Sequence, residues 1–186
     1  MTEPASRPAD IRVGSATDGL APVSIAERPL GAGWSDWLGL AAVAGAAIVA
    51  DQVTKRIVAG TLELGDVKHV VGPLDLHHVQ NTGIAFGLFP RATSIVIVLT
   101  SIVIAWLLVV FARSGARHPV LPVGLGLVVG GSVSNLADRI RLGHVTDFLD
   151  LGWWPAFNLA DTFIVVGVGL LVGAALIADR PRRRPR

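Results

Sequence analysis

The stretch FNLADTFIVVGVGLLVGAALIA, residues 157–178, is an apolar run entered near its start by one carboxylate, Asp161. From Leu159 onward it has roughly the 20 residues that an α-helix needs to cross the hydrocarbon layer of a bilayer. A charge in or near hydrocarbon costs about 2.5–3.5 kcal/mol by insertion measurements, so an acid retained there usually lines a site, a relay or a pore. The run therefore predicts a membrane helix with a functional acid at one end.

Three further runs of this kind lie upstream, at about Trp37–Val58, Ala92–Ala112 and Val120–Ile140. Hydrophobic residues make up 52% of the 186-residue chain and charged residues only 16%, which is too apolar for a soluble domain of this length. We therefore predict an all-α polytopic membrane protein with four transmembrane helices. Spaced glycines in the third and fourth spans predict close helix contacts; these are Gly124, Gly126, Gly130, Gly131, Gly167, Gly169 and Gly173.

The distribution of arginine predicts the orientation. Five of the last seven residues are arginine, and Arg113 and Arg117 flank the connection between the second and third spans. Because an even number of crossings leaves both termini on one side, the positive-inside rule assigns both termini to the cytoplasm. We expect a disordered or loosely ordered cytoplasmic extension over residues 1–36, a membrane domain over 37–178 and a basic cytoplasmic tail over 179–186. Such a tail is typical of a topology anchor that can touch anionic lipid, so no nucleic-acid partner is expected.

The outward-facing connection between the first two spans, residues 59–91, is too long for a tight turn. Its β-prone stretches Val67–Val71 and Leu74–Val79 flank Gly72 and Pro73, which predicts a small β-hairpin or sheet on the membrane surface. Such a hairpin could hold an extended peptide by strand addition.

The other outward-facing connection, residues 141–158, contains Trp153 and Trp154. An aromatic pair of this kind is typical of an anchor at headgroup depth, and we favour that role over substrate contact. The chain has no cysteine, and His77 and His78, being adjacent on a strand, would point to opposite faces without a nearby acid to complete a ligand set. We expect no metal and no cofactor.

Asp147 and Asp161 fall on the same membrane face, where the third span ends and the fourth begins. Two carboxylates held close cannot both ionise cheaply, so they would share one proton and could activate water as aspartic proteases do. Ordinary roles remain open, because Asn158 and Asp161 have the spacing of a helix capping box, and Asp147 and Asp150 could be solvated loop acids. Spacing alone does not decide among these roles.

Two more polar clusters interrupt the spans. Asp51 and Lys55 are four residues apart, the spacing of an internal ion pair along one helix. On the third span Asn135 could face both Asp138 and Arg139, with the guanidinium keeping Asp138 ionised in a structural role, while Arg139 orders the cluster or meets a polar substrate group.

Five motifs occur in order along the chain. They are Asp51-Gln-Val-Thr-Lys55, Asn81-Thr-Gly-Ile-Ala-Phe86, Gly130-Gly-Ser-Val-Ser-Asn-Leu-Ala-Asp-Arg139, Val145-Thr-Asp-Phe148 and Phe157-Asn-Leu-Ala-Asp161. Together this set resembles lipoprotein signal peptidase, also called signal peptidase II, over about residues 37–178. In one departure Ser134 stands where the family usually has glycine, and its side chain could alter helix packing or substrate fit.

The resemblance implies a membrane peptidase domain in the bacterial cytoplasmic membrane, with its active site near the outer face. It implies an aspartic endopeptidase that cuts diacylglyceryl-modified prolipoproteins immediately before the lipidated cysteine, so the expected partners are that substrate and membrane lipids. By motif, Asp147 and Asp161 resemble the catalytic pair. The expected substrate-binding or supporting residues are Asp51, Lys55, Asn81, Asn135, Asp138, Arg139 and Asn158.

Three other classes of function remain. A Ser-Lys hydrolase could use Lys55 with Ser132 or Ser134. A proton-coupled carrier would also place acids among helices, although it would favour mid-membrane charges on inverted repeats, which the sequence does not display. A non-catalytic lipid-binding or assembly subunit would use the hairpin and the aromatic loop for docking.

Overall fold

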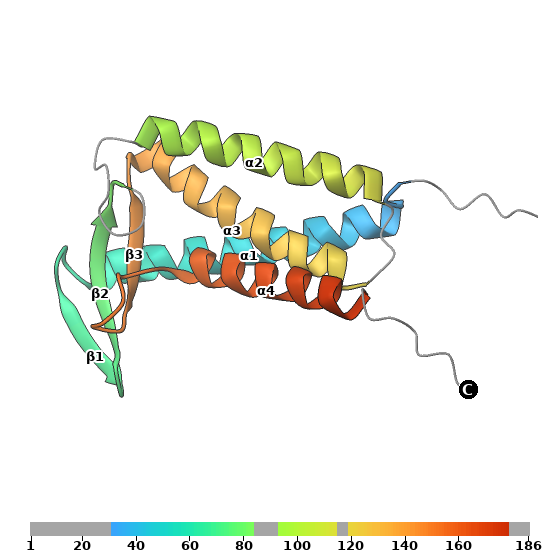
Figure 1. Cartoon of the computed structure of the whole chain (residues 1–186). Helices are drawn as coiled ribbons and strands as arrows, with labels where there is room; N and C mark the ends of the chain where they lie inside the picture. The colour runs from blue at the N-terminus through green and yellow to red at the C-terminus, as the bar shows by residue number, and fades with distance from the viewer. Residues whose placement is uncertain (1–30, 84–92, 115–118, 179–186) are drawn as a thin grey trace, which may run out of the picture.

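The computed structural model describes residues 31–83, 93–114 and 119–178. Within them, four helices run side by side and a three-stranded sheet lies across one end of the bundle (Figure 1). The helices are α1 (Trp34–Thr61), α2 (Thr93–Ser114), α3 (Val120–Leu142) and α4 (Leu159–Ala178), and the strands are β1 (Val67–Val71), β2 (Leu74–Asn81) and β3 (Val145–Asp150). All four helices are long and apolar enough to cross a membrane, which confirms the predicted fold class.

The helix boundaries differ modestly from those predicted. α1 extends beyond the expected span at both ends, so the last residues assigned to the N-terminal extension, from Trp34, are helical. Residues 31–33 of that extension are described but not helical, whereas its residues 1–30 and the basic tail, residues 179–186, lie outside the described residues.

α3 is the central helix of the bundle and contacts each of the other three. In the most apolar part of α3, 56% of the residues are buried. In the most apolar parts of α2 and α4, only 11% of the residues are buried. At the end away from the sheet, Leu40 of α1, Phe111 of α2 and Leu125 of α3 form a small apolar core. The exposed sides of α1, α2 and α4 are therefore the surfaces that face lipid.

Glycine allows α3 to approach its neighbours closely. A Cβ added at Gly130 would lie 2.7 Å from the carbonyl oxygen of Ala44, and one added at Gly131 would meet the backbone of Ala160 in α4. The prediction of close packing is wrong for Gly169 and Gly173, because an added Cβ would have nothing within 4 Å there.

The sheet has the order β1-β2-β3 and is antiparallel throughout. The β1–β2 hairpin was predicted, but β3 comes from the connection between α3 and α4, where only an aromatic anchor was expected. Gly143 ends α3 with a φ of +79°, a left-handed conformation that suits glycine and turns the chain directly into β3. This turn places β3 beside β2, with Val79 opposite Asp147.

Candidate active site

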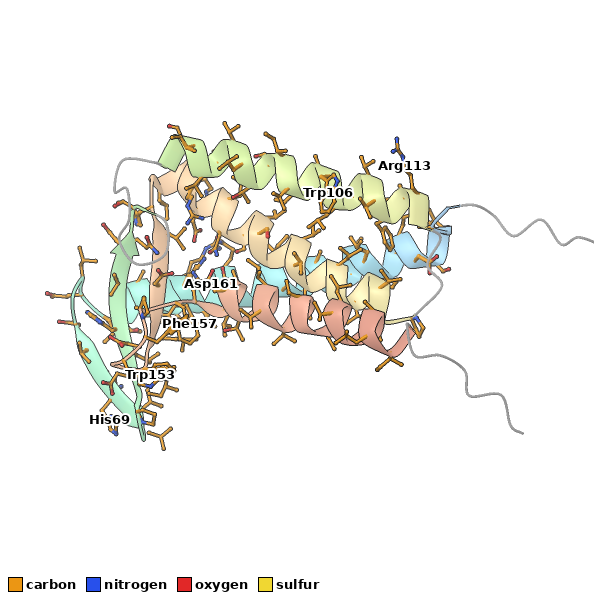
Figure 2. The ribbon with its side chains drawn as sticks, viewed as in Figure 1. His69, Trp106, Arg113, Trp153, Phe157 and Asp161 are labelled. Atoms are coloured by element: carbon orange, nitrogen blue, oxygen red, sulfur yellow. The ribbon has the colours of Figure 1, made fainter. Side chains whose placement is uncertain are left out.

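The start of α4 is fixed by a reciprocal capping box. The Asn158 side-chain oxygen accepts a hydrogen bond from the backbone N–H of Asp161 at 3.0 Å, and the Asp161 carboxylate accepts one from the backbone N–H of Asn158 at 3.3 Å. The capping role that the spacing allowed is therefore confirmed. The same contacts hold the Asp161 side chain at the end of the bundle nearest the sheet (Figure 2).

Asp147 lies on β3 and is 2% exposed. Both of its carboxylate oxygens accept amide hydrogen bonds, one from Asn81 on β2 at 2.9 Å and the other from Asn158 at 2.7 Å. Burial raises the pKa of Asp147 to about 6, and the negative charge of Asp161 acts in the same direction, while the amide of Asn81 opposes both. The carboxyl group thus titrates much closer to neutrality than an ordinary aspartate.

Asn135 of α3 connects the two acids through Asn158. Its Nδ2 donates to Asp161 at 2.8 Å, and its Oδ1 accepts from Asn158 Nδ2 at 3.2 Å. Since Asn158 also donates to Asp147, a continuous chain of side-chain hydrogen bonds joins Asp147 to Asp161. The structure therefore brings the two predicted catalytic acids into one polar cluster.

Behind this cluster, Lys55 of α1 is almost completely buried. Its Nζ lies 2.7 Å from Asp51, 2.7 Å from Asp138 and 2.8 Å from the side-chain oxygen of Asn135. The predicted pair of Asp51 and Lys55 is confirmed, and Asp138 adds a second acid to it. A buried ion pair that is also hydrogen-bonded avoids the large cost of an isolated buried charge.

The prediction for Asp138 was wrong about its partner. Asp138 contacts Lys55 and Gln52 of α1, whereas Arg139 points to another side of α3 and donates to the backbone oxygen of Asn135 at 3.4 Å. Asn135 lies between these two surroundings, because its side-chain oxygen accepts from Lys55, the partner of Asp138, and its backbone oxygen accepts from Arg139. Neighbouring helix residues point about 100° apart, so they can meet different partners.

Gln52 and Ser134 are two members of this network that sequence reasoning did not assign to it. Gln52 donates to Asp138 at 2.7 Å and to the hydroxyl of Ser134 at 3.0 Å, and that hydroxyl donates to Asp51 at 2.7 Å. Asp51 also accepts from the backbone N–H of Ala160 in the first turn of α4, at 2.9 Å. In the sequence, the feature that could have indicated this role was the polar side chain of Gln52 within an otherwise apolar span.

A recess of about 600 Å³ opens in front of the two acids. Its polar lining includes Asn81, Asn135, Arg139, Asp147 and Asp161. The remaining lining is largely apolar and comes from α4 and the segment after β3; it includes Trp153, Trp154, Phe157, Val165 and Val166. The recess thus has carboxylates on one side and a wide apolar wall on the other.

Asp150, the other acid on β3, has a different environment. It accepts hydrogen bonds from the backbone N–H of Gly152 and from His77, both at 2.8 Å, and the Gly152 bond is the main cause that lowers the pKa of Asp150. It does not line the recess. The structure thus separates Asp147 from Asp150, which spacing left equivalent.

The outer histidines each have their own partner. Nδ1 of His69 lies 2.8 Å from Asp75, Nδ1 of His77 contacts Asp150, and Nδ1 of His78 lies 3.0 Å from the backbone oxygen of Leu62. His69 and His77 therefore each have one acid beside them, a contact that the sequence analysis did not predict. Across the described ranges, no three His, Cys, Asp or Glu side chains come together as a metal ligand set.

The family model described as Signal peptidase (SPase) II matches residues 43–177. Among curated proteins, the chain is 45% identical over 141 residues to a lipoprotein signal peptidase of Pelotomaculum thermopropionicum, covering 75% of this chain and 93% of that protein. It is 40% identical over 139 residues to a lipoprotein signal peptidase of Symbiobacterium thermophilum, covering 72% and 91%. A solved bacterial membrane enzyme shares the fold with a TM-score of 0.71 and 28% identity, over 82% of this chain and 94% of that one.

Proposed function

Because the chain belongs to the signal peptidase II family, a family of proteases, we propose that it cleaves diacylglyceryl-modified bacterial prolipoproteins on the N-terminal side of the lipidated cysteine. Asp147 and Asp161 are the proposed catalytic pair. The observation that carries this assignment is that both carboxylates line one recess and are joined through Asn158 and Asn135.

In the proposed reaction the two acids share one proton. The ionised carboxylate takes a proton from a water molecule as the water oxygen attacks the carbonyl carbon of the scissile peptide bond. The protonated carboxyl group donates to the carbonyl oxygen, and the departing amine then receives a proton from the pair as the C–N bond breaks. The raised pKa of Asp147, about 6, supports this role because a proton can be held near neutral pH.

The other polar residues have supporting roles in this proposal. Asn81 and Asn158 orient Asp147, and Asn135 orients Asp161. Arg139 lines the recess and is free to meet a carbonyl or other polar group of the substrate. Asp51, Lys55 and Asp138 lie behind the acids and support the helix ends that carry them.

The shape of the recess favours a lipidated substrate. Val165 and Val166 of α4 line it and are 71% and 47% exposed, so the apolar wall continues onto a lipid-facing surface. Acyl chains and a signal helix could therefore lie along α4 without leaving the bilayer, while the sheet holds the peptide near the acids. In this arrangement both Trp153 and Trp154 contact substrate, a role that the sequence disfavoured.

A Ser-Lys mechanism receives no support from the contacts. Ser134 is fully buried and donates to Asp51, and within the described ranges no hydrogen bond joins Ser132 or Ser134 to Lys55. The family match also disfavours a proton-coupled carrier.

The proposal is tested by replacing each acid with asparagine and measuring cleavage of a diacylglyceryl-modified prolipoprotein in detergent. Asp147→Asn and Asp161→Asn should each lower the rate by at least about 10³-fold, because neither can hold the shared proton. Asp150→Asn is a matched control, since Asp150 is on the same strand but outside the recess, and it should retain nearly full activity. The thermal unfolding midpoint of each variant checks that it folds.

Cleavage at the wild-type rate by either Asp147→Asn or Asp161→Asn would refute the dyad. Ser132→Ala and Ser134→Ala examine the serine alternative directly, and we expect both to remain active. Mass spectrometry of the products should locate the cut immediately before the modified cysteine.

A further inference from the structure

A second, smaller recess of about 160 Å³ lies between the sheet ends of α1 and α3 and is closed by β3. Its polar lining comes from Gln52, Lys55, Arg56, Asp138, Arg141 and Thr146. None of its lining residues lines the recess that holds Asp147 and Asp161. The two recesses lie on different sides of α3. They also lie on opposite faces of β3, because the neighbouring side chains of Thr146 and Asp147 point to opposite faces of the strand.

Of the three cations in this recess, only Lys55 has a charged partner among the residues that the structure describes. The charge of Lys55 is offset by Asp51 and Asp138, each 2.7 Å from its Nζ. Arg56 and Arg141 are exposed, and within the part of the chain that the structure describes neither forms a hydrogen bond or an ion pair. Within the described part of the chain, the recess therefore has two unpaired guanidinium groups near the sheet ends of two adjacent membrane helices.

These guanidinium groups lie at headgroup depth. Arg141 is in the last turn of α3, and Arg56 is five residues before the end of α1, which corresponds to about 8 Å along the helix. The headgroup region on each side of a bilayer is about 5–8 Å thick. The planar guanidinium group of arginine can donate two parallel hydrogen bonds to the oxygens of a phosphate group. A phosphate at this depth would therefore provide acceptors and negative charge for both Arg56 and Arg141.

An apolar path leads from the arginines toward the centre of the bilayer. Val49 and Val53 precede Arg56 at helical spacing on α1 and are 62% and 46% exposed. Leu142, which lines the recess, is 54% exposed. Acyl chains could follow this surface while the attached headgroup occupies the recess, which favours a phospholipid over free phosphate.

We propose that Arg56 and Arg141 form a binding site for the phosphate of an anionic phospholipid, on a different side of α3 from the recess of Asp147 and Asp161. The site carries more positive than negative charge even when Asp51 and Asp138 are counted against Lys55. A headgroup with no positive group of its own, such as phosphatidylglycerol, is therefore preferred to phosphatidylcholine. The bound lipid packs against the helix ends that Lys55 and Asp138 join.

Native mass spectrometry of the full-length protein, stripped of lipid in detergent, tests the site with dioleoyl phosphatidylglycerol as the probe. We expect one tightly retained lipid, and about tenfold weaker binding to the double variant Arg56→Gln/Arg141→Gln. The matched control Lys68→Gln/Arg113→Gln removes the same two charges from exposed positions elsewhere and should bind within about twofold of wild type. The double variant Arg56→Lys/Arg141→Lys keeps both positive charges but lacks the planar guanidinium groups. Its affinity for the lipid should lie between those of wild type and Arg56→Gln/Arg141→Gln.

Equal binding by wild type and Arg56→Gln/Arg141→Gln would overturn the proposal, and so would an equal loss in the Lys68/Arg113 control. Dioleoylglycerol, which has the same chains without phosphate, should bind much more weakly; equal affinity would refute phosphate recognition. Inorganic phosphate binding as tightly as the phospholipid would refute the lipid assignment. Prolipoprotein cleavage in detergent should be unaffected by Arg56→Gln/Arg141→Gln, so the outcome is separate from that of the dyad test.

Discussion

At the scale of single residues, Asp147 is governed by two opposed effects. Burial raises the pKa of its carboxyl group, while the amide hydrogen bond from Asn81 lowers it by stabilising the ionised form. The balance at about 6 lets the group exchange a proton near neutral pH, which an exposed aspartate does poorly. Asn81 therefore influences the proton affinity of the pair as well as its geometry.

Replacement of Asn81 with alanine should move the alkaline limb of the pH–rate profile to higher pH. If cleavage needs one proton on the pair, activity is lost as pH rises through the pKa of the protonated group. Removing a donor that favours the ionised form raises that pKa, and we expect a shift of about one pH unit together with a lower rate. The measurement is kcat/KM against pH, with Asp150→Asn as a control that leaves the limb in place. A limb that stays fixed or moves to lower pH in Asn81→Ala would contradict this account.

At the scale of elements, the first turn of α4 is held from several directions. Its capping box positions Asp161, Asp51 of α1 accepts from the N–H of Ala160, and Gly131 of α3 permits close contact with the Ala160 backbone. The recess that holds Asp147 and Asp161 therefore depends on how closely α3 and α4 pack near the sheet, as well as on the capping contacts of α4 itself.

Gly131→Ala should separate α3 from α4 and reduce cleavage. The added Cβ would meet backbone atoms of Ala160, which cannot move aside as a flexible side chain would. A shift near 1 Å at catalytic groups can cost about 10²-fold in rate, and overpacking typically costs about 1–3 kcal/mol of stability. Gly169→Ala is the matched control because an added Cβ has open space there. Cleavage rates and thermal unfolding midpoints of both variants provide the test, and equal activity would argue against tight packing.

At the scale of the whole molecule, the sheet and the recess lined by Asp147 and Asp161 lie at one end of the bundle (Figure 1). The start of α1 and the end of α4 lie at the other end (Figure 1), and Arg113 of α2 lies toward that second end (Figure 2). Since all four helices are long enough to span a bilayer, the sheet and Arg113 should lie on opposite faces of the membrane. The positive-inside rule then predicts that the sheet is outside the cytoplasm.

Cysteine labelling tests this orientation cleanly because the chain has no cysteine of its own. In right-side-out membrane vesicles, an impermeant maleimide should label Lys68→Cys on β1 and leave Arg113→Cys unlabelled until the membrane is permeabilised. Both positions are exposed, so burial does not account for a difference between them. The opposite labelling pattern would place the recess on the cytoplasmic face.

Local spacing in the sequence determined the features that depend on near neighbours. The apolar runs defined four spans, β-prone residues around Gly72 and Pro73 defined the hairpin, and the interval of four gave the pair of Asp51 and Lys55. The interval of three residues between Asn158 and Asp161 also predicted their capping box, although this interval could not exclude a second role for Asp161. Such contacts are set by the helical and strand periods of the backbone, which do not require knowledge of the packing.

Only the tertiary structure decided which distant side chains meet. In the structure β3 pairs with β2, and Asp147 lines the recess whereas Asp150 does not. Asp138 forms its ion pair with Lys55 and not with Arg139. Gln52 of α1 and Ser134 of α3 form a hydrogen bond between two helices. These contacts connect residues as far apart in the chain as Lys55 and Asp138, and they depend on how α3 is rotated against α1 and α4. That rotation is fixed by close packing at glycine and by the need to pair every buried charge, and both follow from the assembled bundle as a whole.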